Sequence, residues 1–193
     1  RRPELRLVPM SATLDADALS DWLDCPALSA EGRAYPVDTR YRPTDAHTAP
    51  WQSATDALAE LLQSEAEGDI LVFMPGAYEI RRTVKCMTEQ IDRRWNLRFY
   101  PLYSALSVRE QDAALTPSDQ RRVIVSTNVA ETSITIEGIR HVIDSGLARV
   151  HRHDPRRGID VLLIENVSRA SSQQRAGRAG RTAPGTCTRL WSQ

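Results

Sequence analysis

The sequence predicts an α/β protein built on an open, mostly parallel β-sheet with helices on both faces. Short apolar runs alternate with longer segments whose apolar residues recur at helical spacing. The runs end in small or polar residues, as in DILVFMPG from Asp69 and RRVIVST from Arg121. No internal repeat or low-complexity tract interrupts this alternation. Strands separated by helices are typical of parallel sheets, in which ligands bind outside the carboxyl ends of the strands.

In the first part of the chain, helices are predicted where apolar side chains recur every three to four residues, and strands where apolar residues run together. The predicted elements are a helix at 14–23 capped by Thr13 or Asp15, a strand at 37–41, a helix at 51–66, a strand at 69–76, a helix at 77–95, a strand at 97–103 and a helix at 107–115. Residues 31–50 lack a helical period and contain three prolines, so the part outside the strand is expected to be a linker.

The second part continues the same alternation. It predicts a strand at 121–127, a polar loop at 128–138, strands at 140–146 and 158–167, a helix that begins after Ser168 as its N-cap, and a strand at 185–191. The strands at 69–76, 121–127 and 140–146 lead into MPG, STN and DSG. These polar tails are expected to gather along one edge of the sheet.

Composition limits the classes of protein to consider. The 193 residues are 41% hydrophobic, which is enough for one full domain core. No apolar run of about 18 residues and no charged-then-apolar leader is present, so we expect no membrane span, no secretory signal and a cytoplasmic location. Acidic and basic residues balance at 25 each, so any nucleic-acid binding must come from local placement of charge.

Cysteine and histidine do not predict a metal site. The three cysteines, Cys25, Cys86 and Cys187, are far apart and fit no zinc spacing. The candidate histidine ligands, His141, His151 and His153, have no cysteine or carboxylate at ligand spacing. We expect reduced thiols and no bound metal from these residues.

The segment SSQQRAGRAGR at 171–181 concentrates three arginines and two glycines near the start of a predicted helix. If the segment is helical throughout, Gln174, Arg178 and Arg181 stand at i, i+4 and i+7 and line one face. Arg175 then points elsewhere. Two planar guanidiniums on one face fit a polyphosphate, and the glycines let a ligand approach closely. A solvated basic helix face is the alternative that the residues alone leave open.

Four stretches together resemble a known family. They are Ser11-Ala12-Thr13, LVFMPGAYEI from Leu71, STNVAETSITIEG from Ser126 and QQRAGRAGR from Gln173. They occur in the order of motifs III, IV, V and VI of superfamily 2 helicases. The residues of the last two stretches resemble those of the DEAH-box branch, and the whole chain looks most like its bacterial HrpB-type ATP-dependent helicases.

The resemblance implies two pieces of a helicase motor. Residues 1–35 would hold the end of a first RecA-like lobe, with motif III, and a linker; residues 36–193 would form the second RecA-like lobe. The phosphate-binding loop and the DEAH motif lie upstream in this family, and no G-x-x-x-x-G-K-[ST] occurs here. ATP with Mg²⁺ would be bound mainly by the missing first lobe of the same chain, and the fragment alone is expected to be inactive.

The resemblance also assigns residues to the nucleotide. Gln174, Arg178 and Arg181 would reach the γ-phosphate, the two arginines as fingers for the charge that develops in phosphoryl transfer. Three further residues would contact the nucleotide: Glu137, Leu115 and Gly138. Relatives usually carry Asp at the first of these positions and often an aromatic residue at the second, so selection among bases is expected to be loose. Arg175 is expected to be structural and to pair with Glu131 or Asp144.

Motif IV and motif V residues would hold the nucleic acid. The residues assigned to it are Gly76, Thr127, Asn128, Ser133 and Thr135. Hydroxyl, amide and backbone N–H groups at a strand's carboxyl end are suited to phosphates. Turn-forming hydroxyls are the alternative for Ser133 and Thr135. Ser11 and Thr13 would couple the ATP state to strand binding, with an ordinary helix N-cap as the alternative.

These expectations amount to the second motor lobe of an ATP-dependent RNA helicase that moves 3′-to-5′ on single-stranded RNA, possibly also on DNA, with no membrane partner. Two other classes stay open. An RNA-binding module could use the same basic face without an ATPase, and a scaffold could use the lobe as a protein-interaction surface. A Walker lysine and a DEAH quartet encoded upstream would distinguish the motor from both.

Overall fold

The computed structural model describes residues 2, 4–6, 8, 16–28, 35–45, 47–64, 66–132, 134, 136–154 and 158–193. The chain forms two compact units, residues 1–33 and residues 34–193. The first unit contains one helix, α1 (Ala16–Leu23), among its described residues. The second unit contains every other described helix and strand, together with all the predicted site residues that the structure describes.

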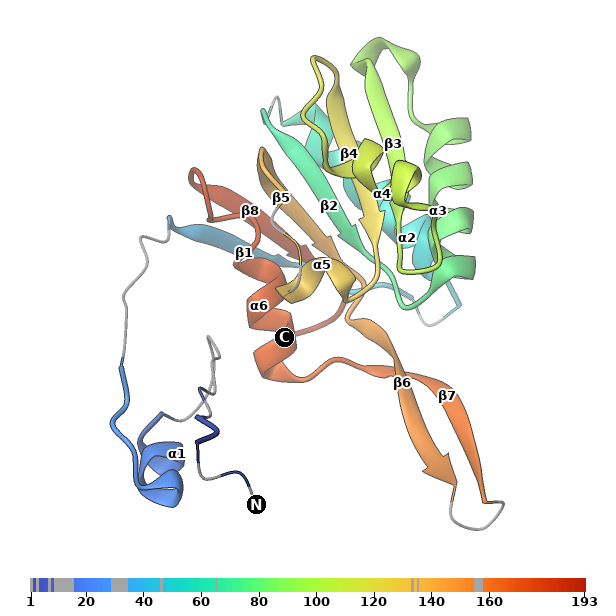
Figure 1. The fold of residues 1–193 in the computed structure, drawn as a ribbon. Helices are drawn as coiled ribbons and strands as arrows, with labels where there is room; N and C mark the ends of the chain where they lie inside the picture. Colours follow the sequence, from blue (N-terminus) through green and yellow to red (C-terminus); the bar gives the residue numbers. More distant parts are fainter. Residues whose placement is uncertain are drawn as a thin grey trace. The chain divides into compact units, whose positions relative to one another are not determined.

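A six-stranded sheet forms the centre of the second unit (Figure 1). Its strands are β1 (Val37–Tyr41), β2 (Asp69–Phe73), β3 (Leu97–Leu102), β4 (Arg121–Ser126), β5 (Ile139–Asp144) and β8 (Gly185–Arg189). The order is β1-β8-β5-β2-β4-β3, and all five neighbouring pairs are parallel. The predicted open parallel sheet is confirmed.

Helices cover both faces of this sheet (Figure 1). One face packs against α2 (Pro50–Gln63) and α3 (Ala77–Gln90), and the other against α4 (Val108–Leu115), α5 (Val129–Thr132) and α6 (Arg169–Ala176). Side chains of β2 alternate between the two cores: Ile70 lies in the α2–α3 core and Leu71 in the other. Burial on both faces explains why the central strands are continuous apolar runs. In the described part of the chain, no helix is long and apolar enough to cross a membrane.

The helix termini follow local chemistry. Pro50 occupies the first turn of α2, where its missing N–H has no intrahelical partner to lose. Ser107 and Glu110 form a capping box that begins α4. The helix predicted at 77–95 is shorter than expected, because α3 ends at Gln90 and a separate 3-10 turn, η1 (Arg93–Trp95), follows.

The largest departure from the predicted topology is a hairpin. The strand predicted at 158–167 exists as β7 (Ile159–Asn166), but it pairs antiparallel with β6 (Leu147–Asp154) and lies outside the parallel sheet. The hairpin projects from the carboxyl-end edge of the sheet (Figure 1). The apolar run of β7 is exposed rather than buried, with side chains 46–53% exposed at Ile159, Leu162, Leu163 and Ile164. Hydrophobicity therefore assigned the strand correctly but did not indicate its antiparallel pairing with β6.

Candidate functional site

The predicted polar edge forms where β5, β2 and β4 end. Phe73 pairs with Ser126 on one side and with Asp144 on the other, so the three strands end level with one another. The segments that follow them, 74–76, 127–128 and 145–146, therefore lie at the same edge of the sheet. The prediction that MPG, STN and DSG gather along one edge is confirmed.

Gly76 and Thr127 leave this edge from neighbouring strands. A Cβ at Gly76 would stand 3.0 Å from Glu79 Oε2 and 3.1 Å from Arg149 Cζ, so a larger residue there would require these side-chain ends to shift. The Thr127 hydroxyl accepts a hydrogen bond from the Val129 N–H at 3.4 Å, at the start of α5. Asn128 is exposed. Its amide is therefore accessible from outside the protein.

Residues 128–138, predicted as a polar loop, begin with the four-residue helix α5. Arg178 binds this segment at two carbonyls, one within α5 and one beyond it. The Arg178 Nε donates to the Glu131 carbonyl at 2.9 Å, and its Nη groups donate to the carbonyls of Glu131 and Ile134. One guanidinium thus fixes the middle of the segment through its backbone, whatever its side chains are. Ser133 and Thr135 lie outside the described residues, as do Ser11 and Thr13.

Arg175 forms the buried ionic centre of the site. Its Nε lies 3.0 Å from Glu131 Oε2 and its Nη1 lies 2.9 Å from Asp144 Oδ1. The guanidinium also stacks over the Phe73 ring, 4.8 Å from its centroid. The expected pairing of Arg175 with a carboxylate is confirmed for both candidates. Burial raises the pKa of Asp144, although the Arg175 charge opposes the rise.

The predicted helical face of Gln174, Arg178 and Arg181 is wrong, because α6 ends at Ala176. Tight turns follow at 177–180, with hydrogen bonds from Arg178 N–H to the Arg175 carbonyl and from Gly180 N–H to the Gly177 carbonyl. Gly177 keeps helical dihedral angles, whereas a Cβ at Gly180 would stand 2.5 Å from the Tyr35 carbonyl oxygen. Gln174 alone of the three lies in the helix.

Arg178 and Arg181 nevertheless lie close together. Burial, together with the neighbouring Arg181 charge, lowers the pKa of Arg178 to about 10. Arg178 is 4% exposed, whereas Arg181 is exposed at the surface. Of the two predicted phosphate ligands, Arg181 is therefore the more accessible to a ligand from outside the protein.

Two of the predicted nucleotide contacts, Leu115 and Glu137, meet at a fourth arginine, Arg122. Its guanidinium donates to the Leu115 carbonyl at 3.2 Å and to the Glu137 carbonyl at 2.6 Å. It also donates to Asp69 Oδ2 at 2.8 Å, which compensates its charge in a position that is only 1% exposed. Leu115 and Glu137, 22 residues apart in the sequence, are thus fixed by one side chain.

Gly138 is required by the fold at this point. Its φ is +87°, and a Cβ there would lie 2.9 Å from Asp69 Oδ2. Both the backbone conformation and the space exclude a larger residue. Gly138 precedes β5 directly, so the predicted nucleotide residues lie toward the amino-end edge, on the face that carries α4, α5 and α6. The predicted strand residues lie at the carboxyl-end edge.

Sequence reasoning missed Arg122 and the first strand of the hairpin. The available signal for Arg122 was a charged residue inside the apolar run RRVIVS. For β6 the signal was the glycine at 158, which has a φ of +63° and follows a segment without helical period. Neither signal identifies the partner group, because the contacts are made with residues distant in the sequence.

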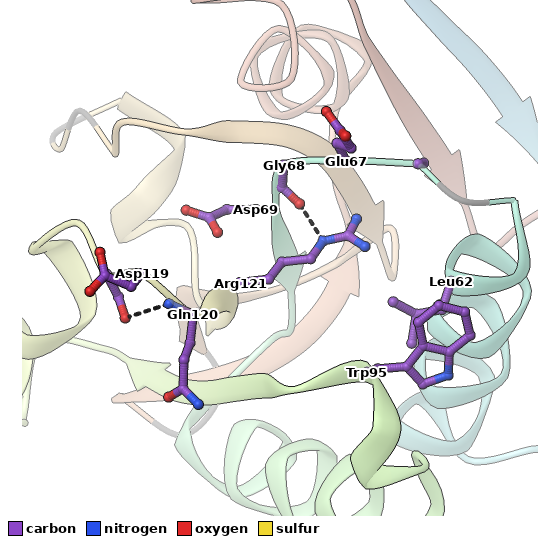
Figure 2. Close-up of a pocket in the computed structure, with 10 residues that line it drawn as sticks. Leu62, Glu67, Gly68, Asp69, Trp95, Asp119, Gln120 and Arg121 are labelled. Carbon is purple, nitrogen blue, oxygen red and sulfur yellow. Dashed lines mark hydrogen bonds between the residues drawn. The ribbon is translucent and has the colours of Figure 1, made fainter.

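One hollow of the described surface shares a single residue, Asp69, with the contacts described above. It has a volume of about 500 Å³ and lies at the amino ends of β2 and β4, between Leu62, Trp95 and Arg121 (Figure 2). Arg121 crosses it and donates to the Gly68 carbonyl at 2.5 Å. No residue predicted to bind nucleotide or nucleic acid lines it. The candidate site is therefore a surface of loops and exposed side chains rather than this hollow.

Comparison with known proteins gave one family model and a set of relatives. Residues 53–183 match the model of the helicase conserved C-terminal domain. The chain is 45% identical to the ATP-dependent RNA helicase HrpB of Escherichia coli K12 over 192 residues, which are 98% of this chain and 23% of that protein. It is 42% identical to the E. coli ATP-dependent RNA helicase HrpA over 202 residues, covering 100% of this chain and 15% of that protein.

Solved structures agree with the sequence comparison. The crystal structure of the E. coli DExH-box NTPase HrpB superposes with a TM-score of 0.86 at 43% identity, over 95% of this chain and 23% of that one. A third relative found by sequence is the Schizosaccharomyces pombe pre-mRNA-splicing factor ATP-dependent RNA helicase prp22, which is 40% identical over 203 residues, covering 100% of this chain and 17% of that protein. The chain spans less than a quarter of the length of each of these relatives.

Proposed function

Because the chain belongs to the helicase conserved C-terminal domain family of DEAH-box RNA helicases, we propose that it is the second motor lobe of an ATP-dependent RNA helicase that moves 3′-to-5′ along single-stranded RNA. ATP with Mg²⁺ is held mainly by a first RecA-like lobe that precedes it in the same protein. The second lobe, formed by this chain, contributes an arginine that binds the nucleotide and backbone contacts that bind the RNA strand. It also links the two sites.

One observation supports this link above all others. The segment 127–138 begins with the strand contacts Thr127 and Asn128 and ends with the nucleotide contacts Glu137 and Gly138. Its middle is bound by Arg178, two residues after the end of α6. A displacement at one end of a segment that is held this tightly must move the other end or strain the contacts between them. Nucleotide state and strand grip are therefore coupled through a single stretch of backbone.

In the proposed reaction, Arg181 supplies the charge that the transition state requires. Its exposed guanidinium offers a planar fork of donors to the γ-phosphate, where negative charge develops as the phosphoryl group is transferred. Gln174 lies on α6, the helix that leads to this segment. Arg178 positions the 131–134 backbone through its carbonyls. Mg²⁺ supplies charge neutralisation at the phosphates, and its ligands belong to the other lobe.

Closure of the two lobes on ATP and release after hydrolysis would then alternate the grip on the strand. Contacts at Gly76, Thr127 and Asn128 go to phosphates and sugars, which are the same in every sequence. Little sequence specificity is expected. The conformational change is the motor step, and the segment 127–138 transmits it within this lobe from the nucleotide to the RNA strand.

The proposal is tested on the intact protein with tailed duplexes. A helicase of this kind hydrolyses ATP faster when single-stranded RNA is added, and it unwinds an RNA duplex with a 3′ overhang but not one with a 5′ overhang. Strand binding without ATP turnover would instead indicate an RNA-binding module. The absence of both would leave a protein-interaction scaffold, and unwinding of the 5′-tailed duplex alone would reverse the proposed direction.

A further inference from the structure

An exposed aromatic side chain lies two residues beyond Gly76. Tyr78, in the first turn of α3, is 53% exposed. Its ring meets the Trp51 ring edge-on, with the centroids 6.0 Å apart and the planes at 86°. Trp51 lies in the first turn of α2. The pair therefore joins the amino-terminal ends of α2 and α3, which lie at the carboxyl-end edge of the sheet (Figure 1). Gly76, Thr127 and Asn128 follow strands that end at this edge.

Positive charge surrounds this aromatic pair. The Arg82 guanidinium lies over the Trp51 ring, 5.0 Å from its centroid. Arg81, the preceding residue of α3, donates to the Tyr103 hydroxyl at 3.4 Å, just beyond β3. On the other side, the Arg149 guanidinium borders Gly76 and lies 3.7 Å from the Glu79 carboxylate. Arg82 thus lies on the aromatic pair and Arg149 beside Gly76, where Glu79 partly balances its charge.

Packing between α2 and α3 explains the position of Trp51 but not the exposure of Tyr78. Trp51 is partly buried and joins α2 to α3, as an aromatic residue between two helices commonly does. Tyr78 contributes one edge to this contact and leaves about half of its surface in solvent. Exposed apolar surface combined with flanking arginines is the combination that binds single-stranded nucleic acid, in which bases stack on aromatic rings and the backbone follows positive charge.

We propose that Tyr78 is a stacking platform for one base of the single strand whose phosphates lie at Gly76, Thr127 and Asn128. The inference rests on the proposed function, because it requires the strand to follow the carboxyl-end edge. Every base offers a π-face, so the platform adds affinity without adding sequence preference. Trp51 supports the tyrosine ring from the side, and Arg82 holds the tryptophan in place.

An abasic scan of the oligonucleotide tests this platform directly in the intact protein. A fluorescent uridine decamer is compared with ten decamers that each lack one base. For the native protein, loss of the base at one position weakens binding by about 5- to 100-fold, the range of a single base–aromatic stack. Tyr78→Ala weakens binding of the complete decamer by the same factor and abolishes the sensitivity to that position. Tyr78→Phe keeps the native affinity for the complete decamer and the sensitivity to that position.

Two further measurements separate stacking from other causes. Tyr78→Leu keeps an apolar contact with Trp51 and should bind as weakly as Tyr78→Ala, so a folding defect in the alanine variant cannot account for the loss. The slope of log affinity against log salt should be the same in both variants as in the native protein, because no phosphate contact is removed. A reduced slope would overturn the stacking assignment and indicate a displaced backbone contact.

The outcomes also distinguish this inference from the proposed function. If Tyr78→Ala binds RNA as the native protein does while Asn128→Ala binds weakly, the platform is refuted and the strand path stands; the exposed ring then belongs to a protein contact. If the native protein binds no RNA at all, the proposed function fails, and the platform fails with it.

Discussion

At the scale of single residues, the segment that ends α6 contains three arginines in three surroundings. Arg175 is buried between two carboxylates, Arg178 is buried against backbone carbonyls, and Arg181 is exposed. A guanidinium surrounded by protein acceptors holds the fold together, whereas an exposed one can be reached by a phosphate. The sequence pattern treats the three as equivalent positions of one motif. Their environments predict different effects of the same substitution.

Alanine at each of the three positions should separate stability from turnover in the intact protein. Arg181→Ala should lower ATP turnover by about 10³- to 10⁵-fold, the range for arginine fingers, with little change in melting temperature. Arg175→Ala leaves two carboxylates buried without their partner and should cost about 3–5 kcal/mol of unfolding free energy. Arg178→Ala should lower both ATP turnover and the free energy of unfolding, because it removes the hydrogen bonds to the carbonyls of Glu131 and Ile134.

Lysine at position 181 is the control for charge. A point charge cannot reproduce the planar fork, so Arg181→Lys should recover little turnover. Steady-state ATPase rates and thermal melts on the same preparations decide the assignment. Native turnover in Arg181→Ala, or equal losses of rate at all three positions without loss of stability, would show that a different arginine meets the phosphate.

His141 makes the folding stability of the protein depend on pH. Its Nε2 donates to the Glu67 carbonyl at 2.7 Å and its Nδ1 accepts from the Thr186 hydroxyl at 2.9 Å, with the tautomer assigned from these partners. Burial lowers the pKa of His141, and the charges of Arg121 and Arg140 lower it further. The unfolded chain therefore binds a proton first as the pH falls below about 6.5, so this histidine makes the fold lose stability from there downward.

Replacement of the histidine tests that sign. His141→Gln keeps a hydrogen-bonding side chain but cannot be protonated, so its unfolding free energy should fall less between pH 7 and pH 5 than that of the native protein. Urea titrations of both proteins at a series of pH values measure the difference. A steeper fall in the variant would mean that the folded protein, not the unfolded chain, is the form that holds the proton.

At the scale of secondary-structure elements, the segment 127–138 joins the residues proposed for the strand to those proposed for the nucleotide. Thr127 both faces the predicted strand path and accepts the Val129 N–H at the start of α5, so changing it alters the element as well as the contact. Asn128 is exposed and offers the cleaner substitution. Its side-chain amide is the group expected on the strand.

Asn128→Ala should weaken binding of single-stranded RNA by about tenfold, since hydrogen bonds to charged groups are worth more than neutral ones. The loss should be equal for all sequences, because a phosphate contact contains no base information. Fluorescence anisotropy with oligonucleotides of four different compositions measures it. A loss confined to one composition would assign Asn128 to a base, and no loss in any would remove it from the interface.

The elements themselves were largely predictable. The strand at 37–41 and the helix that begins after Ser168 match the structure, because β propensity and N-cap chemistry are local. The end of α6 was not predictable from helical spacing. Tight turns replace the helix at 177–180, where a Cβ at Gly180 would stand 2.5 Å from the Tyr35 carbonyl oxygen. The turn depends on a contact with a residue more than 140 positions earlier.

At the scale of the whole molecule, residues 34–193 should fold alone but not turn over ATP. Both faces of the six-stranded sheet are covered by helices of the same unit, so its two cores are complete. The phosphate-binding loop is absent from the sequence. A purified chain of residues 34–193 is expected to melt cooperatively and to show no ATPase activity above a mock preparation. Steady turnover by that chain would show that it contains a complete site.

The sequence by itself determined the class of fold, the succession of helices and strands, and the helicase motifs, because apolar periodicity, caps and motif spacing are properties of neighbouring residues. Tertiary structure decided the strand order β1-β8-β5-β2-β4-β3, the exposed β6–β7 hairpin, and the carbonyls that Arg122 and Arg178 bind. These features depend on contacts between residues far apart in the chain. Whether an arginine meets protein or solvent is set by which distant backbone comes to lie beside it, and no local pattern encodes that position.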